Sequence, residues 1–164
     1  MSSAHKFADP LTERLASFVR SIGIDVRTAT LPEKTVLSGL DIWHDAILVD
    51  ETRMTHPGDI LHEAGHLAVT DPAERSAPTL SPSGGDEMTS IAWSYAALRH
   101  LALDPAIVFH ADGYKGEAAA IIENFTAGRY FGVPLLQFYG MAVEPSGAAE
   151  MAAEPYPHML RRLR

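Results

Sequence analysis

The chain has 164 residues, a formal net charge of −8 and no cysteine, which excludes disulfides and thiolate metal sites. This length suits one ordinary domain whose hydrophobic core needs no crosslinks, and a tightly bound metal would need histidine and carboxylate ligands. The negative charge argues against nucleic acid as a partner, since the basic residues are scattered apart from a C-terminal RRLR.

The N-terminal stretch MSSAHKFADPLTERLASF lacks the basic flank and the continuous apolar stretch of a secretory signal. No apolar run approaches the roughly 18 residues that a helix needs to cross a bilayer. We therefore expect a cytoplasmic protein that does not associate with a membrane.

The first half of the chain predicts a helix, then short strands, then a second helix. Apolar residues recur at helical spacing over residues 11–22, and Gly23 is placed to end that helix. Residues 35–53 contain short β-favouring runs, which predict two or three strands that pair as a hairpin. A helix is then expected from about Asp59 to Val69, because Pro57 suits its first turn and the carboxylate of Asp59 suits its positive end.

The second half predicts a long loop followed by helices. Residues 70–86 are dense in proline, serine and glycine, which is typical of a loop, and a core helix is expected over 86–103. Shorter apolar segments at 116–128 and 133–142 would cover that core. The tail, residues 144–164, is interpreted either as mobile or as docking on a second subunit, which would make a homodimer. The fold class is therefore a mainly helical α+β single domain with a small antiparallel sheet against the second helix.

The stretch DILHEAGHLA places His62, Glu63 and His66 within that second helix. Side chains four residues apart project from one helix face, so both imidazoles can reach one ion. Glu63 lies about 100° round the helix from His62, beside such an ion without binding it. Gly65 lowers helix stability by about 1 kcal/mol relative to alanine, which indicates that another element packs closely at this position.

Zinc is the metal that this pattern predicts. Two neutral imidazoles and one carboxylate leave zinc an open position, at which the pKa of a water falls towards about 7. Glu63 would then remove the proton from that water and deliver it to a leaving amine. The alternative is a pair of structural histidines bonded to backbone carbonyls, with no ion between them.

The third ligand is expected on the helix that follows the long loop. Asp86 comes directly after Ser-Gly-Gly and is predicted to cap that helix, its carboxylate turned back onto the free N–H groups. Glu87 shares a helix face with two serines and is then free to bind the ion. Asp86, Asp71 and His110 remain the alternatives.

Two further residues are candidates for contact with the substrate or with a developing oxyanion, to which each can donate a hydrogen bond. His110 lies in a glycine-rich turn, where a solvent-exposed histidine is the simpler interpretation. Tyr95 lies in the predicted core helix, where burial is the simpler interpretation. The remaining histidines have no partner at ligand spacing and are interpreted as surface residues: His5, His44, His56 and His158.

The segments DAILVDETRMTHPGDILHEAGHLAVTD and GGDEMTSIAWSYAALRHLAL resemble the core of a zincin metallopeptidase, and within that group the compact ImmA/IrrE-type gluzincins. The resemblance covers about Leu37 to Leu103, and the His-Glu-x-x-His pattern is its specific part.

The resemblance implies a zinc-dependent hydrolase that cleaves a peptide or amide bond. It implies His62, His66 and a glutamate on the next helix as ligands, Glu63 as general base, and an edge strand from residues 43–50 that binds a peptide in extended form. No helix-turn-helix or other partner-binding domain identifies the target, so the substrate stays open. The alternative is a noncatalytic zincin-like module that binds or regulates a protein, with structural zinc or none.

Overall fold

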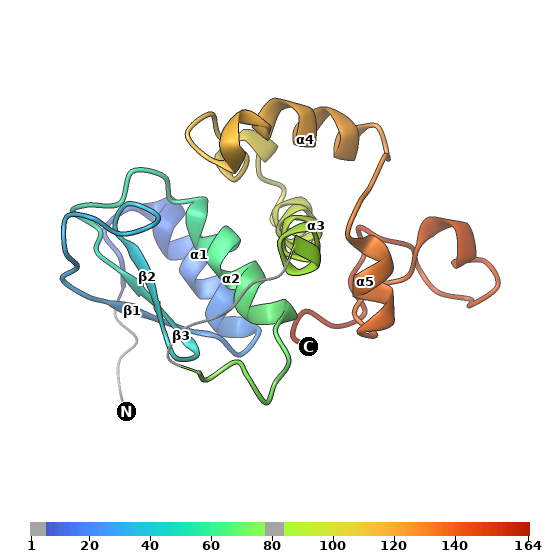
Figure 1. The fold of residues 1–164 in the computed structure, drawn as a ribbon, viewed down its shortest axis with the longest axis horizontal. Helices are drawn as coiled ribbons and strands as arrows, with labels where there is room; N and C mark the ends of the chain where they lie inside the picture. Colours follow the sequence, from blue (N-terminus) through green and yellow to red (C-terminus); the bar gives the residue numbers. More distant parts are fainter. Residues whose placement is uncertain (1–5, 78–83) are drawn as a thin grey trace.

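The computed structural model describes residues 6–77 and 84–164, so His5 lies outside the described residues. Five α-helices and three strands make up this part of the chain (Figure 1). The helices are α1 (Pro10–Ser21), α2 (Asp59–Val69), α3 (Gly84–His100), α4 (Ala118–Thr126) and α5 (Val133–Phe138), and the strands are β1 (Asp25–Thr28), β2 (Leu40–Trp43) and β3 (Ala46–Val49). This arrangement confirms the α+β, mainly helical class.

The N-terminal helix forms where the apolar spacing predicts it. The Asp9 carboxylate accepts a hydrogen bond of 2.9 Å from the Thr12 N–H and caps α1. Leu15 and Val19 are fully buried, and Gly23 follows the helix at φ +104°, a conformation that L side chains rarely adopt. The apolar face of α1 thereby covers α2 and the sheet.

The sheet is mixed, not antiparallel as predicted. β2 and β3 form the expected hairpin around a two-residue turn, but β1 pairs parallel to β3, and the strand order is β1-β3-β2. Residues 25–28 were not predicted as a strand because Val26, the residue of this segment that is buried, is also its one apolar residue. A single apolar residue does not make an alternating pattern.

The strand order also corrects the predicted edge strand. Residues 46–49 form the middle strand, whose backbone is paired on both sides. The edge strand of the described sheet that lies nearest to the predicted position is therefore β2, which ends at Trp43. β3 is central because it is the most apolar of the three strands, with Ala46, Ile47 and Val49 each no more than 1% exposed.

α2 runs through the centre of the molecule and packs closely on α3. The apolar side chains of α2 are fully buried, among them Ile60, Leu61 and Leu67. A Cβ atom built on Gly65 would lie 2.6 Å from the hydroxyl of Ser90 and 3.1 Å from that of Ser94. The close packing that Gly65 indicated is therefore present.

α3 begins earlier than the sequence predicts. Its described part starts at Gly84, so Asp86 lies in the first turn and is not the N-cap residue. Glycines are poor helix formers, and a sequence-based boundary therefore falls after Gly84 and Gly85. The predicted loop at 70–86 is correspondingly shorter, and its residues 78–83 lie outside the described ranges.

The C-terminal segment packs on the core of its own chain. The Tyr156 hydroxyl donates to the carbonyl of Ala92 at 2.6 Å, and the Trp93 indole N–H donates to the carbonyl of Arg162 at 2.8 Å. The backbone N–H of Arg164 donates to Ala68 at 2.9 Å. Docking of residues 144–164 thus needs no second subunit. None of the helices in the described ranges is both long enough and apolar enough to span a bilayer.

We expect Gly65→Ala to destabilise the protein by about 1 kcal/mol in urea denaturation. Overpacking against Ser90 typically costs about 1–3 kcal/mol, which exceeds the roughly 1 kcal/mol that alanine gains in helix propensity. Gly147→Ala is the control, because nothing lies within 4 Å of a Cβ atom at that position. A Gly65→Ala protein as stable as its parent would contradict the close contact.

Candidate metal centre and catalytic base

Three potential metal ligands come together between α2 and α3. The Nε2 atoms of His62 and His66 are 3.1 Å apart, and Glu87 Oε2 lies 3.2 Å from His66 Nε2. One donor atom from each residue lies within 4.8 Å of the other two. Ligands at about 2.0–2.1 Å from a tetrahedral zinc ion are separated by about 3.3 Å, so this donor set fits zinc in both chemistry and spacing.

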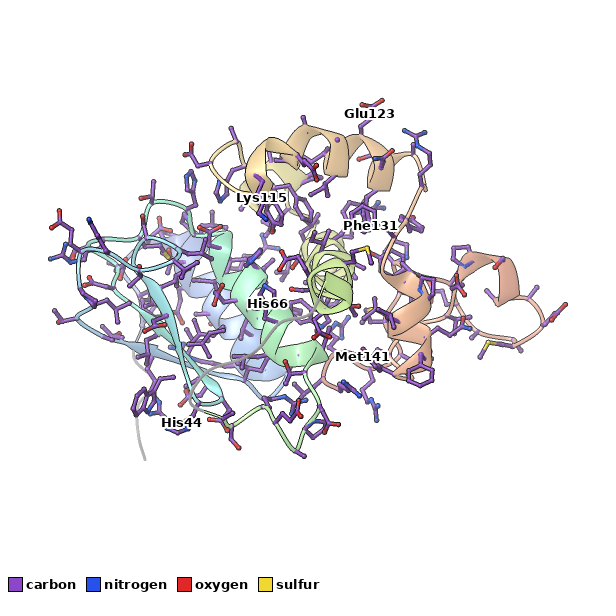
Figure 2. All side chains as sticks on the ribbon, viewed as in Figure 1. His44, His66, Lys115, Glu123, Phe131 and Met141 are labelled. Carbon is purple, nitrogen blue, oxygen red and sulfur yellow. The ribbon has the colours of Figure 1, made fainter. Side chains whose placement is uncertain are left out.

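Local geometry and helix packing each supply part of this group. The spacing of His62 and His66 places the two rings on one face of α2, edge to face with their centroids 4.8 Å apart. Close packing at Gly65 then brings α3 near enough for Glu87 to reach His66. Figure 2 shows His66 between the two helices, with Lys115 on the loop above them.

The pKa values of the two histidines are shifted in opposite directions. Burial, together with the nearby His66, lowers the pKa of His62 to about 4, so its imidazole is neutral at pH 7. Burial also acts to lower the pKa of His66, but the hydrogen bond and charge of Glu87 outweigh it and raise that pKa above its ordinary value. The same hydrogen bond lowers the pKa of Glu87. Both shifts favour the charged forms of His66 and Glu87, and a metal would displace the His66 proton.

Glu63 lies beside these donors and is not one of them. Its Oε1 atom is 4.0 Å from His62 Nε2, and its side chain is 16% exposed. Burial raises the pKa of Glu63 to about 7, and the negative charges of Asp59 and Asp41 add to the effect. A carboxylate with a pKa near neutrality is suited to accept a proton and then return it.

Tyr114 is a residue of the site that the sequence did not reveal. Its hydroxyl lies 2.8 Å from Nδ1 of His62, and its ring contacts Phe109. Burial raises the pKa of Tyr114, which keeps the phenol protonated. With Nε2 of His62 facing the other donors, Nδ1–H donates to the tyrosine oxygen, and this fixes both the tautomer and the orientation of the ring. Gly113 and Gly116 indicate a turn here, but no spacing connects that turn to His62.

The other candidate ligands and contacts lie elsewhere. Asp71 is 3.9 Å from Arg164, and Asp86, although near enough to raise the pKa of His66, is not part of the donor group. Tyr95 is buried, and its hydroxyl accepts a hydrogen bond of 3.0 Å from Arg99, so the predicted core position is confirmed. The structure does not place Tyr95 or Asp71 beside Glu63 or the two histidines.

The interpretation of His110 as an exposed residue is wrong, and His56 is only partly exposed, with 28% of its side chain accessible. The His110 side chain is only 10% exposed, and its Nε2 lies 2.7 Å from Asp59 Oδ1. The ring of His56 stacks on that of His110 with centroids 3.6 Å apart. The packing of two distant loops brings these rings together and covers most of His110, and the sequence around each histidine cannot show that. His158 is a surface residue as predicted, 3.4 Å from Glu154, and His44 contacts the carbonyl of Ser76.

No family model matches the chain, and no curated protein and no solved structure matches it either. The roles of these residues therefore depend on their geometry and chemistry.

We expect Tyr114→Phe to lower the affinity for zinc roughly 10- to 100-fold, because the hydrogen-bond acceptor that orients His62 is lost. Competition with a chromophoric zinc chelator measures the affinity. Tyr139→Phe is the control, since that ring packs against the Arg164 guanidinium at 3.8 Å and not against a histidine. Equal affinities for Tyr114→Phe and the parent would show that the contact does not orient His62.

Proposed function

We propose that the protein is a zinc-dependent hydrolase that cleaves a peptide or amide bond. His62, His66 and Glu87 would hold the zinc, and Glu63 would act as general base. One observation carries the proposal. His66 Nε2 lies 3.1 Å from His62 Nε2 and 3.2 Å from Glu87 Oε2, while the carboxyl group of Glu63 lies 4.0 Å from His62 Nε2 and is not one of the donors.

Zinc, when bound, supplies a Lewis acid that acidifies a water and polarises a carbonyl. Glu63 orients that water, takes its proton and delivers it to the leaving amine. Burial raises the pKa of Glu63 to about 7 in the absence of a cation, and this acts against the lowering that a bound cation would cause. Tyr114 would orient His62 through the contact of its hydroxyl with Nδ1.

The substrate we propose is an extended peptide segment. In the described part of the chain, β2 is an edge strand that pairs with β3 and otherwise forms only an isolated bridge at Leu40, and Asp41 of this strand is close enough to Glu63 to affect its pKa. A peptide that adds to this edge would run past the catalytic base, with its backbone held by main-chain hydrogen bonds. We place the activity in the cytoplasm, with a peptide or protein as substrate and no nucleic acid or membrane partner.

The first test is metal content. We expect protein dialysed against metal-free buffer to retain about one zinc per chain, and His62→Ala to retain none, because one of two neutral imidazole ligands is lost. Elemental analysis measures the ratio. His158→Ala is the control, since that imidazole lies at the surface, 3.4 Å from the carboxylate of Glu154, and is not one of the proposed ligands. Stoichiometric zinc in the His62→Ala protein would overturn the ligand assignment.

The second test separates the base from the ligands. We expect Glu63→Gln to keep the zinc and to lose about 10²- to 10⁴-fold in turnover, the usual contribution of a general base. Parent and variant are incubated with a peptide library, and new peptide ends are counted by mass spectrometry. Glu154→Gln, a change at an exposed carboxylate, is the control. Equal cleavage by Glu63→Gln and parent would exclude Glu63 as base, and no cleavage by the parent would favour the noncatalytic binding module.

A further inference from the structure

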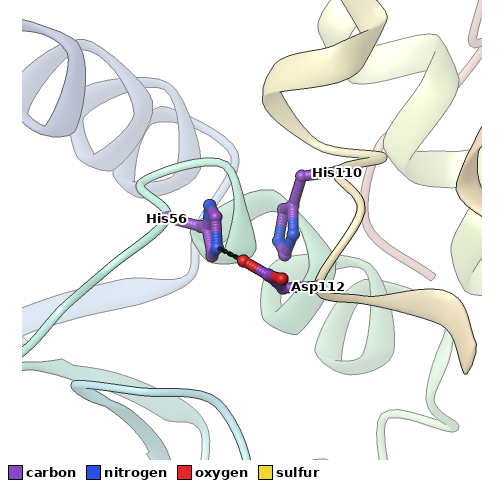
Figure 3. Close-up of side chains that lie close together, drawn as sticks. All are labelled: His56, His110 and Asp112. Carbon is purple, nitrogen blue, oxygen red and sulfur yellow. Dashed lines mark hydrogen bonds and ion pairs between the residues drawn. The ribbon is translucent and has the colours of Figure 1, made fainter. Parts of the chain in front are cut away.

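A second group of potential metal ligands lies near the N-terminal end of α2. It consists of His56, on the segment between β3 and α2, and of His110 and Asp112, on the loop that carries Tyr114 (Figure 3). His56 Nε2 lies 2.8 Å from Asp112 Oδ2, and a donor atom from each of the three residues lies within 4.8 Å of the other two. Two imidazoles and one carboxylate form a donor set that suits Zn²⁺, Ni²⁺ or Cu²⁺.

His110 is held in the way that metal-binding histidines usually are. Its Nε2 atom lies 2.7 Å from Oδ1 of Asp59. Asp59 is itself a buried residue, only 5% exposed. A carboxylate on one ring nitrogen fixes the tautomer and leaves the other nitrogen with its lone pair. That other nitrogen, Nδ1, is buried and has no hydrogen-bond partner in the described part of the chain. Buried polar atoms without partners are rare, and the binding of an ion is one of the few ordinary reasons for them.

We propose that His56, His110 and Asp112 form a second site for a divalent transition metal, with Asp59 orienting His110. This site is separate from the group of His62, His66 and Glu87, and the proposal does not depend on the hydrolase function. An ion bound here would connect the segment before α2 to the loop that presents Tyr114 to His62.

Metal binding at this site requires a movement of His56. The rings of His56 and His110 are stacked, 11° from parallel, whereas an ion bound by an imidazole lies in the plane of its ring. The His56 ring must therefore turn, while Asp59 keeps the His110 ring fixed. The exposures of the side chains allow this, since His56 is 28% and Asp112 is 76% exposed. We accordingly expect weaker binding than at the more buried first site, with exchange against added metal.

The test is a calorimetric titration of the dialysed protein with zinc chloride. We expect one equivalent of zinc to bind beyond whatever the dialysed protein retains. His56→Ala and Asp112→Asn should each weaken this binding more than about tenfold, because each removes a ligand of the ion. Asp112→Asn changes an exposed side chain and preserves its shape, so it tests the site without endangering the fold. His158→Ala is the matched control, a surface histidine that also contacts a carboxylate.

The same titration on the His62→Ala protein separates this proposal from the hydrolase. The added equivalent should persist there, and Asp112→Asn in that background should remove it. No added equivalent in the parent, or one that both His56→Ala and Asp112→Asn leave unchanged, would overturn the second site. Failure of the hydrolase proposal would affect only the zinc that His62→Ala removes.

Discussion

The close packing of α2 on α3 is the contact on which the candidate centre depends. Gly65 has no side chain, and the hydroxyls of Ser90 and Ser94 occupy the space that a Cβ atom would need. The Ser94 hydroxyl also lies 3.3 Å from the carbonyl of Leu61 on α2, although its nearer acceptor is the carbonyl of Ser90 at 2.8 Å. Because α3 lies this near, Glu87 reaches the imidazole of His66. The glycine weakens the helix locally, and this is offset by the contact that it permits.

Negative charge also gathers around the largely buried carboxyl group of Glu63. The charges of Asp41, Asp59 and Glu87 all act to raise the pKa of Glu63, beyond the effect of burial. Buried charges are costly unless they are paired, and removing one partner leaves the other uncompensated. The ion pair of His66 and Glu87 meets part of this requirement. A divalent cation between the three donors would meet it more fully, which is a physical reason for a metal here that is independent of the sequence pattern.

One loop serves both groups of histidines. Residues 110–116 bring His110 to Asp59 and Tyr114 to His62, and Asp59 lies one helical turn before His62 on α2. Tyr114 and Lys115 in this loop have φ values of 58° and 54°, which non-glycine residues adopt only at a cost of about 1–3 kcal/mol. The contacts of Tyr114 and His110 hold the loop in that conformation. The position of the loop therefore couples the orientation of His62 to the surroundings of His56.

The sequence by itself determined the parts of the centre that lie within one helix. The spacing of His62, Glu63 and His66 fixes their relative directions because an α-helix has 3.6 residues per turn, and Gly65 indicated a close neighbour for the same local reason. The sequence favoured Glu87 over Asp86, Asp71 and His110 because Glu87 shares a face with two serines on the next helix, but the N-cap role for Asp86 in that argument is wrong. Only the tertiary structure decided which distant groups support them. Tyr114 is 52 residues from His62, and His110 is 51 residues from Asp59. The parallel pairing of β1 and the docking of Tyr156 are likewise contacts between distant segments. No local periodicity encodes such contacts, because they depend on how the whole core packs.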